Sequence, residues 1–145
     1  MDSKIYVAGH RGLIGSALVR MLRQRGCKSV LTRTRAELDL ADATAVEGFF
    51  TRENPEYVLL AAGRVGGIAV NRDRPAEFLA ENLAIELNVI GAARRAGVRR
   101  LILFASSCMY PREAPQPMTE SLLFSGRPEE TSMAYAVAKY AGMQF

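Results

Sequence analysis

The stretch Ile5-Tyr6-Val7-Ala8-Gly9-His10-Arg11-Gly12-Leu13-Ile14-Gly15 decides the fold of this chain. A short apolar run ends at its first glycine, and two more glycines follow at a spacing of three residues. Beyond the last glycine, apolar residues recur with the period of a helix. The stretch therefore predicts a strand, a glycine turn and a helix, the setting in which a helix N-terminus binds a diphosphate. The alternative is a tight turn that only brings helix and strand close together.

Length, composition and charge are those of a soluble α/β domain. The chain has 145 residues, 49% of them hydrophobic, and a net charge of +4. Its cysteines, Cys27 and Cys108, match neither a disulfide framework nor a zinc site, so no metal is expected. The sequence has no apolar run of membrane-spanning length and no leader before the first strand, so a cytoplasmic protein without a membrane partner is expected. The positive charge suits phosphate-bearing ligands, whereas the scattered arginines argue against nucleic acid.

Apolar runs and helical patterns alternate through the rest of the chain, with a glycine-containing loop at 63–74. Strands are expected at 29–32, 57–62 and 100–105, and helices at 42–50, 75–97 and 132–145. This alternation predicts the α/β class: a doubly wound parallel sheet (Rossmann-like), with helices on both faces and the strand order 3-2-1-4. Ligands of such a sheet bind at the carboxyl ends of the strands.

The helix at 75–97 carries two apolar stripes. Such a pattern indicates either deep burial within one subunit or contact with a second subunit. We expect a homodimer through the helices at 75–97 and 132–145.

The end of the second expected strand carries arginines where NAD-binding proteins carry an acid. A carboxylate about 20 residues past the glycines would bind a ribose 2′-hydroxyl. Here Arg33 and Arg35 occupy that place, and the first acid is Glu37. Guanidinium groups match a 2′-phosphate, so the sequence favours NADP over NAD. The alternative is a pair of exposed arginines at a strand end.

Tyr135 and Lys139 lie four residues apart and share one face of the last expected helix. A lysine ammonium lowers the pKa of a neighbouring phenol, which can then exchange a proton with a substrate oxygen as hydride moves. Ser106, at the end of the fourth expected strand, could hydrogen-bond the same oxygen. The alternatives are an ordinary helix surface for the pair, and capping of the strand end for Ser106 and Ser107.

Cys108 admits two interpretations from local sequence. A thiolate could abstract an acidic proton beside a ketone, or the side chain could be a small buried hydrophobe. The only histidine, His10, lies in the glycine turn and is expected near phosphate rather than as a catalytic acid.

Gly9-x-x-Gly12-x-x-Gly15 together with Tyr135-x-x-x-Lys139 resembles the extended short-chain dehydrogenase/reductases. Within that group, five segments of the sequence are similar to the GDP-L-fucose synthase family: residues 8–12, 33–38, 65–68, 106–111 and 116–120. The resemblance implies a GDP-sugar substrate, GDP-4-keto-6-deoxy-D-mannose, that is epimerised at C3 and C5. It also implies reduction of the C4 ketone with NADPH to give GDP-L-fucose.

The resemblance also implies roles for individual residues. Cys108 would transfer the epimerising proton, and Ser106, Tyr135 and Lys139 would carry the reduction. The residues implied to bind NADP are Gly9, His10, Arg11, Gly12, Leu13, Ile14, Gly15, Arg33, Arg35, Asp39, Leu40, Phe104, Ala105, Ser106, Ser107 and Lys139.

Members of that family are about twice as long, and a histidine in them serves as the acid partner of the cysteine. Residues 1–145 are therefore expected to form an incomplete NADP-binding Rossmann domain, without C-terminal strands and substrate region, that is inactive alone. Two other interpretations stay open. One is another NADP-dependent sugar-nucleotide epimerase or dehydratase, and the other is a non-catalytic nucleotide-binding module.

Overall fold

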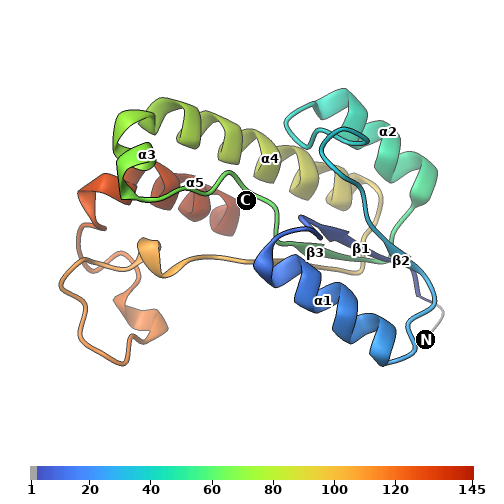
Figure 1. Ribbon diagram of the computed structural model, residues 1–145, viewed down its shortest axis with the longest axis horizontal. Helices are drawn as coiled ribbons and strands as arrows, with labels where there is room; N and C mark the ends of the chain where they lie inside the picture. The colour runs from blue at the N-terminus through green and yellow to red at the C-terminus, as the bar shows by residue number, and fades with distance from the viewer. Residues whose placement is uncertain (1–2) are drawn as a thin grey trace. The chain divides into compact units, whose positions relative to one another are not determined.

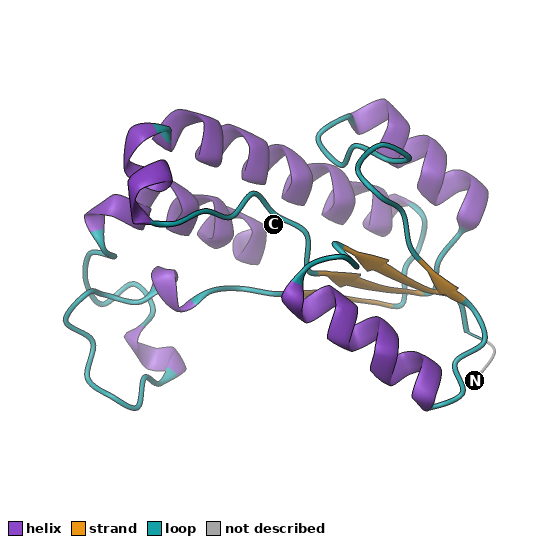
Figure 2. Cartoon of the chain, in the orientation of Figure 1, coloured by secondary structure: helices purple, strands orange, loops and turns teal. Residues whose placement is uncertain are grey.

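The computed structural model describes residues 3–145, which form two compact units. The first unit comprises the chain up to Gly63 together with Ala84–Phe104, and the second comprises Arg64–Leu83 together with Ala105–Phe145. Helix α4 (Pro75–Arg95) contributes residues to both units. Figure 1 labels the helices and strands for which there is room, and Figure 2 colours all of them by type.

A parallel sheet lies at the centre of the first unit (orange in Figure 2). Its strands are β1 (Ile5–Ala8), β2 (Val30–Leu31), β3 (Tyr57–Leu60) and β4 (Arg100–Leu103), in the spatial order β2-β1-β3-β4. Ile5 lies opposite Val30 on one side and Tyr57 on the other, and Tyr57 lies opposite Arg100. All of β1 is buried, as expected for a strand covered on both faces.

The structure confirms the doubly wound parallel sheet, but the predicted strand order 3-2-1-4 is wrong. The prediction placed the third strand outside the second, whereas β3 pairs with the other side of β1. β2 is two residues long and half-buried, which suits an edge. Val58 and Leu60 are fully buried, which suits a strand with a neighbour on each side. In residues 3–145 no strand lies beyond β2, because the segment that follows it forms turns.

Helices cover both faces of the sheet, as predicted (Figure 1). α1 (Leu13–Gln24) packs on one face, while α2 (Ala43–Glu53) and residues 84–95 of α4 cover the other. The core under α2 is aromatic: the centroid of the Tyr6 ring lies 4.6 Å from that of Phe49 and 6.1 Å from that of Phe50. These rings bind α2 to the sheet through burial and edge contacts.

The predicted elements are found with small shifts at their ends. α2 begins at the predicted cap, because the Asp42 side chain accepts a hydrogen bond from the Ala45 N–H at 3.0 Å. It continues to Glu53 instead of Phe50, and Asn54 ends it in a left-handed conformation with φ of 46°. The strands are shorter than predicted at their carboxyl ends.

The second unit is mostly helical and irregular. It holds α3 (Ile68–Asp73), the first half of α4, and α5 (Met133–Gln144), with short 3-10 helices at Ser107–Met109 (η1), Glu120–Leu122 (η2) and Glu130–Ser132 (η3). α5 packs against η1 and η3, and α3 packs against η3. α3 lies inside the segment predicted as a loop. Among the helices of residues 3–145, none combines the length and the apolar character needed to cross a bilayer.

Candidate active site

Two glycines of the turn are required by the fold itself. Gly9 has φ of 82°, and a Cβ there would lie 2.7 Å from the carbonyl group of Ala61. A Cβ on Gly15 would collide with the carbonyl oxygen of Gly9, so α1 can approach β1 this closely only with glycine there. Gly12 is different, because its φ of −75° is ordinary and a Cβ would meet only the Gly9 oxygen, at 3.4 Å. A side chain at Gly12 would instead occupy the space outside the turn.

The first turn of α1 is open to an anion. Gly12 is its N-cap, no side chain caps the helix, and its first turn contains no acidic residue. Leu13 and Ile14 are 91% and 46% exposed, Arg11 is exposed, and His10 is half-buried. Backbone N–H groups and the helix dipole therefore present positive potential at this end of α1.

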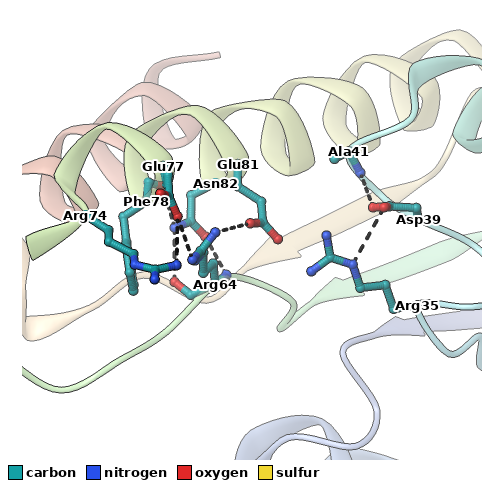
Figure 3. Close-up of polar contacts among 9 residues, drawn as sticks. All are labelled: Arg35, Asp39, Ala41, Arg64, Arg74, Glu77, Phe78, Glu81 and Asn82. Carbon is teal, nitrogen blue, oxygen red and sulfur yellow. Dashed lines mark hydrogen bonds and ion pairs between the residues drawn. The ribbon is translucent and has the colours of Figure 1, made fainter. Parts of the chain in front are cut away.

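Arg33 and Arg35 differ in what they contact. Arg33 is half-buried: its guanidinium pairs with Glu53 at 2.8 Å, and its Cζ lies 5.4 Å from the centroid of the Phe49 ring. Arg35 is largely exposed, and its Nε lies 3.6 Å from Asp39 Oδ2 (Figure 3). An exposed pair of this kind contributes little to stability. The fold thus uses Arg33 to hold α2 and leaves the Arg35 guanidinium at the surface.

Basic side chains from two segments act on Glu37. Its carboxylate accepts hydrogen bonds from the backbone N–H and the hydroxyl of Thr34, at 2.7 and 2.8 Å. These bonds, with the charges of Arg33 and Arg11, lower the pKa of Glu37 below its ordinary value. Arg11 belongs to the glycine turn and Arg33 follows β2, so the positive charges of both segments lie close enough to Glu37 to lower its pKa.

Three more predicted cofactor residues of the first unit are held by hydrogen bonds. Asp39 Oδ1 accepts from the backbone N–H two residues further on, at 3.0 Å (Figure 3). Leu40 is buried, and its carbonyl accepts from the Asn88 side chain on α4 at 3.0 Å. The Phe104 N–H donates to the Leu60 carbonyl at 3.2 Å, which extends the β3–β4 pairing past the strand ends.

In the second unit, η1 carries Ser107 and Cys108, and Ser106 caps it. The Ser106 hydroxyl oxygen accepts from the Cys108 N–H at 3.2 Å, and the Met109 N–H donates to the Ser106 carbonyl at 3.1 Å. Accepting this bond uses a lone pair of the hydroxyl and leaves its hydrogen to be donated elsewhere. Ser106 therefore caps η1 and not the end of β4, and this hydrogen bond is compatible with substrate contact. Cys108 is half-buried.

Tyr135 and Lys139 share one face of α5, as their spacing predicts. The Lys139 Nζ lies 5.8 Å from the centroid of the Tyr135 ring. Lys139 is 3% exposed, whereas Tyr135 is half-buried. A buried ammonium beside a partly accessible phenol is the arrangement that favours proton exchange at the phenol oxygen. Because α5 packs against η1, the second unit brings this pair and the Ser106–Cys108 segment onto adjoining elements.

The predicted site residues are divided between the units as follows. The first unit holds Gly9, His10, Arg11, Gly12, Leu13, Ile14, Gly15, Arg33, Arg35, Asp39, Leu40 and Phe104. The second unit holds Ala105, Ser106, Ser107, Cys108, Tyr135 and Lys139.

No sequence motif indicated the polar residues that hold the 64–67 segment. Asn71 is buried and its Nδ2 donates to the carbonyls of Gly66 and Gly67, at 2.7 and 3.1 Å. The Arg64 guanidinium pairs with Glu81 at 2.8 Å and Glu77 at 3.0 Å (Figure 3). A signal was present for a neighbouring residue of α4: Asn82 lies between the apolar positions Phe78 and Ile85, where a buried amide needs partners.

A glycine turn before α1, a basic strand end and a Tyr-x-x-x-Lys helix are thus present in the structure, as the resemblance to the extended short-chain dehydrogenase/reductases implies. The chain belongs to the NAD dependent epimerase/dehydratase family, whose sequence pattern matches residues 5–145. It is thus part of an enzyme family that works with nicotinamide cofactors.

Named relatives and solved structures resemble this chain over nearly its whole length. GDP-L-fucose synthase 1 of Arabidopsis thaliana is 50% identical over 99% of this chain and 44% of its own length. GDP-L-fucose synthase of Escherichia coli strain K12 is 48% identical over 97% of this chain and 44% of its own length. MlghC, a GDP-mannoheptose C4 reductase from Campylobacter jejuni solved with NADP bound, is 44% identical with a TM-score of 0.93, over 97% of this chain and 45% of its own. The chain therefore spans less than half the length of these proteins.

Proposed function

We propose that this chain supplies the NADP-binding and catalytic side chains of an enzyme that converts GDP-4-keto-6-deoxy-D-mannose to GDP-L-fucose. The carrying observation is the second unit, where the Tyr135–Lys139 pair lies on the helix that packs against the Cys108 segment. Relatives named GDP-L-fucose synthase support the choice of substrate. Below, "the complete protein" means the protein in which residues 1–145 occur, over its whole length.

The residues of the first unit fit a dinucleotide. The fold could accommodate a side chain at position 12, yet the residue there is glycine. The absence of a side chain leaves room for a diphosphate at the uncapped start of α1. Arg35, with Arg11 from the glycine turn, would bind the 2′-phosphate. Arg33 would support this site through its charge, since its guanidinium is paired with Glu53. The remaining residues assigned to cofactor binding are His10, Leu13, Ile14, Asp39, Leu40, Phe104, Ala105, Ser107 and Lys139.

NADPH, when bound, supplies the hydride for reduction of the C4 ketone. Tyr135 gives its phenolic proton to the C4 oxygen as that oxygen becomes an alcohol. Lys139 stabilises the phenolate that is left, and the Ser106 hydroxyl donates a hydrogen bond to the same C4 oxygen. These three side chains therefore protonate and orient the oxygen without forming a covalent bond to the sugar.

Cys108 would perform the epimerisation. The protons at C3 and C5 are acidic because they lie beside the C4 ketone. A Cys108 thiolate accepts such a proton and the electrons pass to the ketone oxygen as an enolate. An acid on the other face, the role of a histidine in the resembling family, then gives a proton to the carbon. The Ser106 hydroxyl stabilises the enolate oxygen by a hydrogen bond. Ser106 thus serves both reactions, whereas Cys108 serves the epimerisation and Tyr135 the reduction.

We also propose a cytoplasmic homodimer. Free thiols at Cys27 and Cys108 suit a reducing compartment. Leu87 on α4 and Val137 and Met143 on α5 are 40–42% exposed, so both helices offer apolar side chains to a second subunit. Light scattering of the complete protein tests the dimer. Since relatives are more than twice as long, residues 1–145 by themselves are proposed to be inactive.

The test is an assay of the complete protein with GDP-4-keto-6-deoxy-D-mannose and NADPH. The expected result is NADPH oxidation that depends on the sugar nucleotide, with GDP-L-fucose as the product and solvent deuterium at C3 and C5. Reduction without deuterium at these carbons would point to a simple C4 reductase. Binding of NADPH without any turnover would instead indicate a nucleotide-binding module, and would overturn the proposal.

A further inference from the structure

Besides packing, a side-chain hydrogen bond joins α5 to η1. The hydroxyl of Tyr140 donates a hydrogen bond to the backbone carbonyl of Met109. Tyr140 directly follows Lys139 on α5, and Met109 directly follows Cys108 at the end of η1. The bond therefore joins the immediate neighbours of two groups to which the proposed function gives different reactions.

Phe124 covers this tie from the loop between η2 and η3. Its ring stacks on that of Tyr140, with centroids 4.5 Å apart and an interplanar angle of 28°. Phe124 has φ of 67°, a left-handed conformation that bulky residues rarely adopt, and it is 58% exposed. An unfavourable backbone conformation persists where surrounding contacts require it. The stacking of the Phe124 ring on Tyr140 is the contact that requires the left-handed backbone at Phe124.

The backbone around Cys108 is held from both sides. On the N-terminal side, the Cys108 N–H donates to the Ser106 hydroxyl at 3.2 Å. On the C-terminal side, the next carbonyl, that of Met109, is held by Tyr140. Met109 is 1% exposed, so its carbonyl has little access to water as a substitute partner. The Tyr140 hydroxyl thus gives α5 a direct hydrogen bond to the backbone next to Cys108.

We propose that Tyr140, covered by Phe124, is a positioning residue that holds Cys108 in register with Tyr135 and Lys139. The proposal rests on the proposed function, which gives Cys108 the epimerising proton transfer. Tyr140 acts through the Met109 carbonyl and does not touch the substrate. Its loss affects the thiol more than the phenol, because Tyr135 and Lys139 are held by α5 itself.

The test uses Tyr140→Phe in the complete protein, in a Cys27→Ser background. This variant removes the hydroxyl and keeps the ring that stacks on Phe124. The rate of solvent deuterium exchange at C3 and C5 is expected to fall by about 10-fold or more, because small misplacements of reacting groups slow a reaction by such factors. Reduction of the separately prepared, already epimerised ketone is expected to stay within about 2-fold of the unmutated rate. A matched control is Tyr57→Phe, which removes a hydroxyl on β3 and is expected to change neither rate.

A second readout does not require turnover. With Cys27 removed, alkylation by iodoacetamide is followed by mass spectrometry of the peptide that contains Cys108, and its rate reports how the Cys108 thiol is held. Tyr140→Phe is expected to raise that rate about 3-fold or more, because η1 loses its tie and Cys108 is only half-buried. Phe124→Gly relieves the left-handed backbone and removes the stack. It is therefore expected to change exchange and alkylation in the same direction without loss of thermal stability.

The proposal requires both changes in Tyr140→Phe. Unchanged alkylation, or exchange within about 2-fold of the unmutated rate, would show that Tyr140 is only a packing residue. An equal loss of exchange and reduction would show a general loss of structure and would also overturn it. If the unmutated protein turns over no GDP-sugar, the proposed function fails, while alkylation still decides whether Tyr140 positions Cys108.

Discussion

Asn82 on α4 binds the peptide group of Arg64 at both of its polar atoms. Its Oδ1 accepts from the Arg64 N–H at 2.8 Å, and its Nδ2 donates to the Arg64 carbonyl at 3.1 Å (Figure 3). The same Nδ2 donates to the Phe78 carbonyl at 2.8 Å. Asn82 is 1% exposed, so these bonds form out of contact with water. One buried amide therefore fixes the backbone of Arg64, the first residue of the second unit.

Replacing that amide is expected to be costly. In Asn82→Leu, the Arg64 N–H and carbonyl lose their partner, and unsatisfied buried groups of this kind cost about 3 kcal/mol together. Urea denaturation of the complete protein measures the change. Asn88→Leu is the matched control, because Asn88 is a half-buried asparagine of the same helix that donates only to carbonyls. An equal or larger loss in the control would contradict the importance of the Arg64 contact.

Substitutions of the two arginines after β2 are expected to affect different properties, NADPH binding for one and stability for the other. Arg35→Ala should weaken NADPH binding by about 1.5–3 kcal/mol, the contribution of a hydrogen bond to a charged group, and leave NADH binding unchanged. Arg33→Ala should mainly lower stability, because it removes the Glu53 pair and the contact with the Phe49 ring. Titration with both cofactors, alongside thermal melts, separates the two effects. The assignment fails if Arg33→Ala abolishes the NADPH preference and Arg35→Ala does not.

Cys108 and Tyr135 are expected to separate the two reactions. Cys108→Ser should abolish deuterium exchange at C3 and C5 and largely preserve reduction of the epimerised ketone, since a hydroxyl is a poor carbon base. Tyr135→Phe should preserve exchange and abolish reduction, because it removes the proton donor for the C4 oxygen. Mass spectrometry of the sugar nucleotide measures exchange, and NADPH absorbance measures reduction. Normal exchange in Cys108→Ser would make Cys108 a packing residue.

A salt bridge between α2 and α4 gives stability a pH dependence. Arg95 Nε donates to Glu47 Oε2 at 3.0 Å, and this bond lowers the pKa of Glu47 below its ordinary value of 4.5. A carboxyl whose pKa is lowered by folding stabilises the protein above its unfolded-state pKa, and this stabilisation is lost as the pH falls through the folded-state pKa. Glu47→Gln is therefore expected to lower the Tm at pH 7 and to have no effect once the pH is below that lowered pKa.

The pair is exposed, so its effect on the Tm should be small and should shrink with added salt. Melting curves of both proteins at low and high ionic strength provide the control. A Tm difference that persists at acidic pH would mean that Glu47 acts through packing.

The outer edge of β4 is expected to drive association of residues 1–145. In the part of the chain that the structure describes, β4 is the last strand of the sheet, and Ile102 on it is 45% exposed. An open apolar edge pairs with other chains. Ile102→Lys should reduce self-association in light scattering. Met21→Lys is the matched control on α1, since Met21 is 53% exposed and lies on neither helix of the proposed dimer. An equal effect of the control would mean that added charge, and not the β4 edge, prevents association.

The sequence by itself determined the features that depend on neighbouring residues. The strand–turn–helix at the N-terminus follows from glycine spacing and apolar period, and the structure has it between β1 and α1. The Asp42 cap and the shared face of Tyr135 and Lys139 follow from spacings of a few residues on one helix. Such features are local, so one stretch of sequence contains all the groups that form them.

Only the tertiary structure decided which distant segments meet. β3 lies between β1 and β4, and the shorter, less buried β2 lies at the edge. Which of the two strands takes the edge depends on both of them, so neither segment of sequence alone determines it. Likewise, three hydrogen bonds described above join residues that lie 18 to 31 positions apart in the sequence. They link Arg33 to Glu53, Asn82 to Arg64 and Tyr140 to Met109. Hydrophobic period indicates which face of an element is buried, but the polar partner it meets there is set by the packing of other elements.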